Sequence, residues 1–479
     1  MKDRLVYFNT SHKKESVEFA KKLESLGYDI YCAPSLANYF SKNKISFIEI
    51  KEEGDYSFIK AIQNGRYNDG AFTLKKPDII VCDFKENSSL TQELGIMNLI
   101  YSASVSQDIL ILINPLDYDK VIDKLKILGD LSEDVLKFYA SKALNYSLYR
   151  QAKISLGLFP FSFSFDSLVL PLFKKYKLAY GENPHQKAFF YTSSDEKEQN
   201  ISYLLKGESL NLNHYIDLNL LNELILSIDE PACAISKHGN LVGLAISDRL
   251  SLAFQKAIKS DLTISASGVC AFNRILDEKT ALLLSENYIE CVSAPDFEKE
   301  AIEVFKFKKK DIKLVKSPLF LSPAGSMEFF SINGGFVVQE KDDTDIMNKY
   351  EVVTNRKPDL EEMRILKYTA LISRYSKTYS AVFFSENSTL AISGAQPSVY
   401  DAIKVLIEKA KYKKAFTKTC KLALGVNGAL NFKAIKELSD FNISVIIQPG
   451  HWLEDEQCIE FCNKRNISML FTRLRHYKH

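Results

Sequence analysis

Short apolar runs alternate with amphipathic stretches in the first part of this chain, and this alternation restricts the possible folds more than any other feature of the sequence. Four apolar runs have the length of buried strands: residues 5–8, 29–32, 78–82 and 109–113. Residues 16–26 have the period of an amphipathic helix, and Gly27 stands where a helix C-terminus favours glycine. The pattern predicts an α/β domain.

A second unit is expected after residue 160. Residues 132–156 predict a long helix, and the aromatic run 159–165 with Pro160 follows it. Strand-like runs then alternate with helices again, at residues 188–192, 232–236, 336–339, 380–384 and 445–448. A chain of 479 residues is too long for one continuous core, so at least two domains are expected, the second α/β and of two lobes. No repeat period is visible in the sequence.

Charge and composition exclude several classes of protein. Lys plus Arg is 62 and Asp plus Glu is 60, a formal charge of +2, which gives no footprint for nucleic acid. The longest apolar runs are too short to span a bilayer, and the N-terminus lacks the pattern of a secretory signal, so a cytoplasmic location is expected. The eight cysteines are dispersed, which predicts reduced, buried thiols; Cys458 and Cys462 have no partner pair with zinc spacing, so no metal is expected.

Lys237 and His238 are the first candidates for chemistry. They follow an apolar run, and Gly243 with an expected helix comes next. A fixed positive charge beside a group that titrates near neutrality suits acyl or phosphoryl transfer. The alternative is a surface lysine beside a loop histidine. The sequence has no P-loop, no G-x-G-x-x-G after a strand and no G-x-S-x-G, so the common nucleotide cradles and the hydrolase elbow are not expected.

Two further polar clusters stand out. Residues 180–186, Tyr-Gly-Glu-Asn-Pro-His-Gln, are nearly all hydrogen-bonding residues shaped by a glycine and a proline, and the alternative for them is a polar turn. Residues 473–479 form a basic C-terminus that could be a frayed tail. A strand expected at residues 468–471 would fix this tail and make Arg475 a candidate for binding phosphate or carboxylate.

Taken in order, these segments resemble the bifunctional purine biosynthesis family that combines AICAR (5-aminoimidazole-4-carboxamide ribonucleotide) formyltransferase with IMP cyclohydrolase. The resemblance covers nearly the whole chain. Its blocks are YGxNPHQ at 180–186, LxGKxLxxN approximated at 205–213, EPAC with KH at 230–243, AFN at 271–273, SxxGGxxVQ at 331–339, GAGQxS approximated at 394–398, IIQPG at 446–450 and RHxxH at 475–479.

The resemblance implies a fold and a reaction. The fold would be a methylglyoxal-synthase-like parallel-sheet domain at residues 1–158 and a two-lobed, cytidine-deaminase-like formyltransferase domain at 159–479, in a homodimer. In the family, the exocyclic amine of AICAR attacks the formyl carbon of the co-substrate 10-formyltetrahydrofolate, and the N-terminal domain closes the ring to IMP. The implied partners are thus an AICAR-like nucleotide and a folate, with no metal, nucleic acid or membrane.

The resemblance also implies roles for individual residues. Lys237 and His238 would assist charge development and proton transfer, and His185 would act with them as a catalytic residue that, like Asn183, orients the substrate. Glu290 would face the ribose or base. The remaining implied substrate-binding residues are Tyr180, Asn213, Gln396 and Arg475, of which Arg475 would face the nucleotide.

Several family positions are replaced. Ala179 stands for an arginine, Tyr379 for the asparagine of SNS, and Val399 for the arginine after GAGQxS. The SAFGG and SDAFFPF segments correspond to residues 265–268 and 425–431, both altered. Lost contacts of about 1–3 kcal/mol each would weaken AICAR binding by orders of magnitude unless other residues compensate.

The N-terminal half departs further. The phosphate-binding STGGT is replaced by residues 32–36, which contain Pro34 and no glycine; KTLHPKIHGG is shortened at 64–71 without histidine; RAAAKNH at 100–106 has neither Arg nor Lys. We expect the cyclohydrolase activity to be lost. Three readings of the whole chain follow: a formyltransferase with a rebuilt pocket, a catalytically impaired paralogue that keeps fold and dimer as a nucleotide-binding or interaction protein, or another transferase or hydrolase on this scaffold.

Overall fold

The chain folds into two compact units. The computed structural model describes residues 4–50, 54–68, 73–84, 89–158, 166–192, 203–261, 268–309, 311–317, 326–412 and 421–479. Unit 1 comprises Met1–Lys174 with Tyr191–Ser193, and unit 2 comprises Lys175–Phe190 with Ser194–His479. The domain boundary expected between residues 158 and 159 falls at the edge of the segment 159–165, which lies outside the described residues.

Unit 1 is built on a five-stranded parallel sheet in the order β3-β2-β1-β6-β7. Its strands are β1 (Arg4–Asn9), β2 (Tyr28–Cys32), β3 (Ile48–Glu49), β6 (Ile79–Cys82) and β7 (Leu110–Leu112), with a separate ribbon of β4 (Arg66–Asn68) and β5 (Thr73–Lys75). The four strands expected from the apolar runs are confirmed. Strands β1, β6 and β7 are buried on both faces, which explains why their sequences are apolar runs, whereas β2 alternates between buried and more exposed positions.

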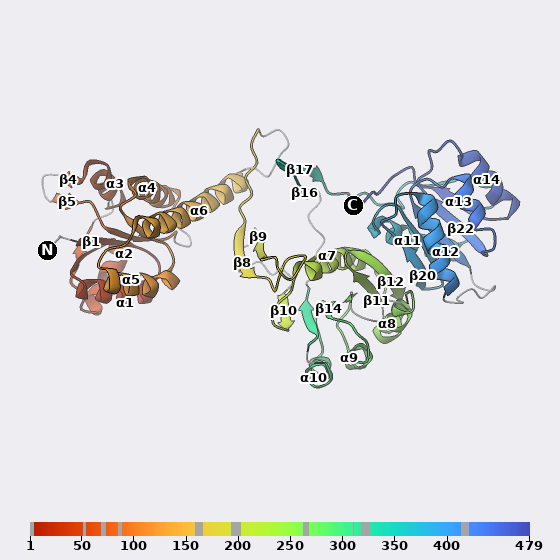
Figure 1. The fold of residues 1–479 in the computed structure, drawn as a ribbon, viewed down its shortest axis with the longest axis horizontal. Helices are drawn as coiled ribbons and strands as arrows, with labels where there is room; N and C mark the ends of the chain where they lie inside the picture. The colour runs from red at the N-terminus through yellow and green to blue at the C-terminus, as the bar shows by residue number, and fades with distance from the viewer. Residues whose placement is uncertain are drawn as a thin grey trace. The chain divides into compact units, whose positions relative to one another are not determined.

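Helices cover both faces of this sheet (Figure 1). They are α1 (Lys13–Ser25), α2 (Pro34–Lys42), α3 (Gly54–Asn64), α4 (Leu90–Ser106), α5 (Tyr118–Leu128) and α6 (Glu133–Leu158). One core packs α1, α2 and α5 against the sheet, and the other packs α3, α4 and α6. Gly27 follows α1 with φ of +83°, the left-handed conformation expected for it.

Unit 2 is built on a twelve-stranded mixed sheet in the order β10-β15-β14-β13-β11-β12-β20-β19-β21-β22-β23-β18. Its strands are β10 (Tyr203–Lys206), β11 (Ala232–Lys237), β12 (Asn240–Ile246), β13 (Val269–Phe272), β14 (Cys291–Ala294), β15 (Lys313–Lys316), β18 (Glu351–Val352), β19 (Ser380–Ser385), β20 (Ser388–Ser393), β21 (Leu422–Asn427), β22 (Ile443–Gln448) and β23 (Ser468–Phe471). Its helices are α7 (Leu212–Leu226), α8 (Leu250–Ile258), α9 (Glu278–Ser285), α10 (Lys299–Lys308), α11 (Leu360–Tyr375), α12 (Val399–Tyr412), α13 (Phe432–Glu437) and α14 (Asp455–Lys464).

The two lobes of unit 2 repeat one order of elements. The first lobe runs α7-β11-β12-α8-β13-α9-β14-α10-β15, and the second runs α11-β19-β20-α12-β21-α13-β22-α14-β23. Each lobe begins with a helix and an antiparallel hairpin and continues with three parallel strands. The lobes join where β12 pairs antiparallel with β20. The sequence shows no period because the two copies share the pattern of elements and not the residues.

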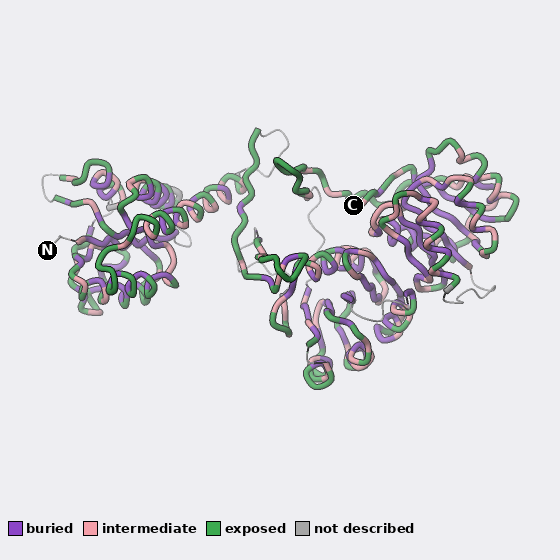
Figure 2. Tube along the Cα trace, in the orientation of Figure 1, coloured by how far each residue is buried: buried purple, intermediate pink, exposed green. Residues whose placement is uncertain are grey.

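Three cores hold unit 2 together. Two of them are private, one to each lobe. The third lies under α7 and α11 and contains side chains of both lobes, such as Leu221 and Ile365. Buried and exposed positions alternate along the helices, as the colours of Figure 2 show. The lobes therefore share one apolar layer in addition to the strand pair β12–β20.

Two ribbons of unit 2 lie outside the large sheet. They are formed by β8 (Phe173–Lys177) with β9 (Phe189–Thr192), whose ends belong to unit 1, and by β16 (Met327–Ile332) with β17 (Gly335–Glu340). The second ribbon exposes five large apolar side chains: Phe329, Phe330, Ile332, Phe336 and Val337. Among the described helices of the whole chain, none combines the length and the apolar character that a bilayer span requires.

Candidate functional site

The Lys237–His238 pair lies on a tight hairpin turn between β11 and β12. Lys237 pairs with Asn240 across the turn, and the two residues between them have positive φ: +53° at His238 and +69° at Gly239. Two-residue hairpins of this kind require the left-handed conformation at both central positions. The helix expected around Gly243 is wrong, since the segment is β12. A Cβ at Gly243 would lie 2.2 Å from the Ala257 carbonyl oxygen, so this glycine serves the close approach of α8.

A buried carboxylate fixes this turn. Asp217 of α7 accepts hydrogen bonds from the backbone N–H of His238 at 3.2 Å and of Gly239 at 2.8 Å. Burial raises the pKa of Asp217, and the hydrogen bonds from the two N–H groups oppose that rise. The histidine side chain itself is exposed. One helix therefore determines the direction in which the candidate proton carrier leaves the sheet.

The polar cluster at residues 180–186 is a closed turn. Asn183 donates from its backbone N–H and its amide to Oε1 of Gln186, at 2.8 and 3.1 Å, and the backbone N–H of Gly181 donates to the Gln186 carbonyl at 2.9 Å. Tyr180 is partly buried and its carbonyl accepts from Leu212, whereas Asn183 and His185 have exposed side chains. The turn presents these two side chains to solvent.

The N-terminal turn of α7 connects this cluster with Glu290. Asn213 donates its amide to the Glu182 carbonyl at 3.1 Å, which ties the 180–186 turn to the helix. Its neighbour His214 is buried and lies with Nε2 3.5 Å from a carboxylate oxygen of the exposed Glu290. Helix α7 thus carries contacts to three of the segments singled out in the sequence: the 180–186 turn, Glu290 and the Lys-His turn.

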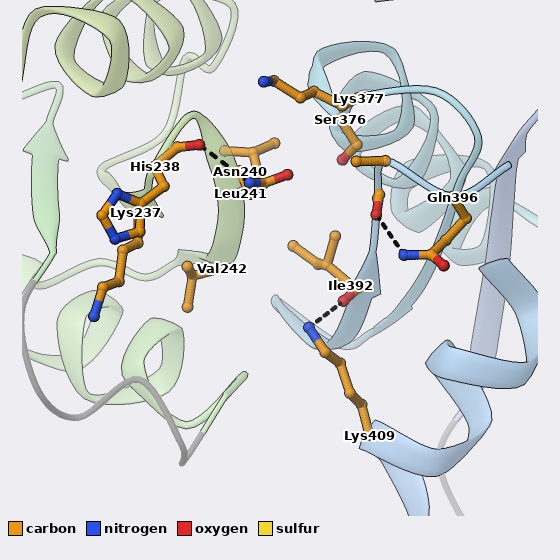
Figure 3. Close-up of a pocket in the computed structure, with 12 residues that line it drawn as sticks. Lys237, His238, Asn240, Leu241, Val242, Ser376, Lys377, Ile392, Gln396 and Lys409 are labelled. Carbon is orange, nitrogen blue, oxygen red and sulfur yellow. Dashed lines mark hydrogen bonds between the residues drawn. The ribbon is translucent and has the colours of Figure 1, made fainter. Parts of the chain in front are cut away.

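A cavity of about 370 Å³ opens beside the Lys-His turn, between the two lobes (Figure 3). The first lobe contributes its hairpin, and the second contributes residues 376–377, the end of β20, the segment 394–396 and one side chain of α12. The lining residues are Lys237, His238, Asn240, Leu241, Val242, Ser376, Lys377, Ile392, Gly394, Ala395, Gln396 and Lys409. Three are lysines and none carries a carboxylate. Of the sequence-predicted site residues, the cavity brings together Lys237, His238 and Gln396.

Gln396 belongs to the second wall and connects it with the C-terminus. Its backbone exchanges hydrogen bonds with Tyr379, at 2.8 and 3.2 Å, and its amide donates to the Gly394 carbonyl at 3.0 Å. The Tyr477 hydroxyl lies 3.3 Å from that of Tyr379, and the exposed Arg475 guanidinium lies 5.9 Å from the centre of the Tyr477 ring. Arg475 is therefore near the second wall but does not line the cavity.

Three of the replaced family positions contact one another. A Cβ at Gly428, which has φ of +147°, would lie 2.6 Å from Cδ1 of Tyr379 and 2.7 Å from Cγ2 of Val399. The Tyr379 ring thus occupies the space that Gly428 leaves open. These departures are one coupled change of packing. Residues 265–267 of another replaced segment lie outside the described residues, as do residues 69–71 of the 64–71 segment.

The C-terminal tail is held in place, as the expected strand at 468–471 requires. His476 is buried and its Nδ1 lies 2.5 Å from a carboxylate oxygen of Asp342, while its carbonyl accepts from the Asn427 amide at 2.6 Å. Burial alone would raise the pKa of Asp342, but the hydrogen bond and charge of His476 and the nearby Arg374 bring it below its usual value. The reading of a frayed tail is wrong.

Unit 1 has a different arrangement at the carboxyl ends of its strands. The buried Asp83, which follows β6, accepts hydrogen bonds from the Thr10 hydroxyl and from the backbone and hydroxyl of Ser11, all between 2.8 and 2.9 Å. The Nε2 atom of His12 lies 3.2 Å from the same carboxylate. A second carboxylate, Asp55, accepts from Tyr7 and the Asn9 amide at 3.0 Å.

The described cysteines have the burial that the sequence predicts. The described cysteines are all buried and free, including Cys458 and Cys462 on α14, and Cys420 lies outside the described residues. Within the described ranges no three His, Cys, Asp or Glu side chains gather as a metal site would require.

Sequence reasoning missed Asp217, Lys377 and Lys409. Asp217 is one of several polar residues on α7, and nothing in a single sequence separates it from a solvated carboxylate. The two lysines belong to a wall that exists only because β20 pairs with β12, a contact that joins positions 245 and 388. No local signal could have found them.

The chain is similar to known proteins over nearly its whole length. The family profile described as AICARFT/IMPCHase bienzyme matches residues 102–409, more than half of the chain. A bifunctional purine biosynthesis protein PurH of Persephonella marina is 30% identical, over 99% of this chain and 100% of that protein. PurH proteins of Caldicellulosiruptor saccharolyticus and Aquifex aeolicus are also 30% identical, each over 98% of this chain and over 98% and 99% of their own lengths. The chain belongs to the AICARFT/IMPCHase bienzyme family.

Proposed function

We propose that unit 2 is an AICAR formyltransferase whose site is the cavity beside the Lys-His turn. The observation that carries this proposal is the combination of Lys237 and His238 on a turn fixed by Asp217 with a cavity lined by lysines and no carboxylate. Both substrates of the family, a nucleotide phosphate and a folate, are anions, and a positive cavity attracts them.

The chemistry follows from the groups present. The exocyclic amine of AICAR attacks the formyl carbon of 10-formyltetrahydrofolate, a C–N bond forms, and a negative charge develops on the formyl oxygen. Lys237 stabilises this charge, and His238 takes a proton from the attacking amine. The C–N10 bond then breaks as N10 receives a proton, giving formyl-AICAR and tetrahydrofolate. A positioned proton carrier contributes about 10²- to 10⁴-fold in rate. His185, Asn183, Tyr180, Asn213, Glu290 and Arg475 would orient the substrates.

We further propose that unit 1 has lost the cyclohydrolase activity. Helix α2 begins at Pro34 with Ala33 as its N-cap residue, so the segment that corresponds to the phosphate loop has neither a capping side chain nor a glycine. Asp83 follows β6, and Asp55 in the first turn of α3 accepts hydrogen bonds from Tyr7 and Asn9 of β1, so two carboxylates lie near the C-terminal ends of these strands, where they would repel a phosphate. The methylglyoxal-synthase-like and cytidine-deaminase-like assignments of the two domains remain part of this proposal.

A homodimer is also proposed. The β16–β17 ribbon exposes large apolar side chains. An isolated two-stranded ribbon is only marginally stable in water, so a partner that covers these side chains would stabilise it. A second copy of the chain is the partner that the family resemblance implies.

One observation favours the catalytically impaired paralogue as a second candidate. Ala179, in place of a family arginine, has an exposed side chain, and Arg473 is engaged 2.6 Å from a Glu351 carboxylate oxygen. Arg473 thus already has an acidic partner in this structure.

Calorimetric titration with AICAR, followed by a spectrophotometric assay of tetrahydrofolate release, separates the two candidates. If the protein is the formyltransferase, it binds AICAR and releases tetrahydrofolate, and His238→Ala and Lys237→Ala lower kcat by at least about 10²-fold. His12→Ala in unit 1 is the matched control and leaves formyl transfer unchanged. Binding without turnover in a folded dimer supports the paralogue, and unchanged turnover in both active-turn variants rejects the mechanism.

A further inference from the structure

The second wall of the cavity carries a lysine to which no function has been given. Lys377 precedes β19 and faces the Lys-His turn across the cavity (Figure 3). A Cβ at Gly239 would lie 3.5 Å from its Cε and 3.6 Å from its Nζ, so the end of this side chain is in van der Waals contact range of the turn. The ammonium group of the second lobe thus reaches the residue next to His238.

The backbone of Lys377 is fixed at both sides. Its carbonyl accepts from the Ala395 backbone N–H at 2.8 Å, and the N–H of Thr378 donates to the Lys478 carbonyl at 2.9 Å. A Cβ at Gly394 would lie 3.3 Å from the Lys377 carbonyl oxygen, which shows how closely the two segments pack. The main chain of Lys377 is thus held on both sides, and its four-carbon stem carries the ammonium group to the Lys-His turn.

The lysines of the cavity differ in their engagement. The Lys409 ammonium lies 3.2 Å from the buried Asp261 carboxylate and donates to the Ile392 carbonyl at 3.0 Å. The Lys377 ammonium, by contrast, makes no hydrogen bond or ion pair with any part of the chain that the structure describes. Because no carboxylate lines the cavity, nothing there neutralises it.

We propose that Lys377 binds an oxyanion of a substrate, phosphate or carboxylate, and thereby holds the reacting groups against the Lys-His turn. An ammonium group recognises such an anion as a point charge with three donors. The identity of the substrates in this inference rests on the proposed function. The binding of an anion does not, because it follows from the ammonium group itself. It also supplies a positive charge near Tyr379 and Val399, where the family resemblance implies that polar contacts were lost.

The test uses the full-length protein and three variants. Lys377→Met removes the charge at similar length, Lys377→Arg retains it, and Lys404→Met on the outer face of α12 is the control, since Lys404 pairs with Glu437 and does not line the cavity. Titration calorimetry with inorganic phosphate and with AICAR measures anion binding without turnover. We expect Lys377→Met to weaken binding by roughly 10- to 100-fold, with Lys377→Arg and the control near wild type.

Substrate arms identify the anion. If Lys377 binds the nucleotide phosphate, Lys377→Met raises KM for AICAR and has no effect with the nucleoside that lacks the phosphate. If it binds the glutamate of the folate, KM rises for 10-formyltetrahydrofolate and not for the 10-formyl-tetrahydropteroate analogue. Equal binding of phosphate, AICAR and 10-formyltetrahydrofolate by wild type and Lys377→Met overturns the inference. Wild-type binding without turnover overturns the proposed function alone, and loss of that binding in Lys377→Met then still supports the anion site.

Discussion

Replacement of Gly428 by alanine tests the coupled packing of Gly428, Tyr379 and Val399. The new Cβ would lie 2.6 Å from the Tyr379 ring and 2.7 Å from Val399, both closer than real Cβ contacts. Overpacking of this kind costs about 1–3 kcal/mol, and φ of +147° adds about 1–3 kcal/mol of backbone strain for a residue with a side chain. We therefore expect Gly428→Ala to lower the free energy of unfolding by about 2–6 kcal/mol.

The single tryptophan provides the assay. Trp452 lies in the second lobe, so its fluorescence during urea titration follows this unit and not unit 1. Gly334→Ala is the control, because Gly334 has φ of +87° but nothing within 4 Å of a new Cβ, so it is expected to cost only the backbone strain of about 1–2 kcal/mol. Gly428→Ala with Tyr379→Asn should recover part of the loss. A Gly428→Ala protein within 0.5 kcal/mol of wild type, taking about 0.5 kcal/mol as the scatter of surface substitutions, would refute the coupling.

Three other outcomes are expected. Asp217→Asn leaves one good acceptor for the two N–H groups of the turn, so kcat falls about 10-fold while KM for both substrates and the circular dichroism spectrum stay unchanged; a change in KM alone would contradict its role as a positioning residue. The pKa of Asp342 is lower in the folded than in the unfolded protein, where it is about 4, so the ionised carboxylate stabilises the fold at higher pH. This stability is lost as the pH falls through the folded-state pKa. His476→Gln should remove on the order of 1 kcal/mol at neutral pH and flatten this acid dependence in urea titrations at several pH values. Phe336→Asp on the β16–β17 ribbon should weaken self-association in sedimentation velocity experiments, and an unchanged dimer would exclude the ribbon from the interface.

The sequence predicts strands and helices well wherever burial is on both faces. The runs at residues 78–82 and 445–448 are continuous apolar segments and form β6 and β22, because parallel strands covered by helices need no alternation. The helix predicted around Gly243 is wrong, because a glycine that lets a helix carbonyl approach a strand looks the same in sequence as a glycine at the start of a helix. Local patterns do not distinguish the two uses of glycine.

Only some residues of the candidate site could be predicted from the sequence. Lys237 and His238 are recognisable because they adjoin in sequence and follow a strand. Asp217 lies twenty residues before them and Lys377 lies in the other lobe, and both reach the turn only after the strands have paired. The repeated order of elements was equally invisible, since both lobes satisfy the same packing rules with different side chains.

The apolar layer under α7 and α11 makes the two lobes one cooperative unit. Separating them would expose the side chains they share, such as Leu221 and Ile365, to water, so melting of one lobe destabilises the other. The cavity takes its walls from both, and a ligand that spans it adds its binding free energy to the stability of the whole unit. Melting of unit 2 is thereby thermodynamically linked to the concentration of any ligand that binds in this cavity.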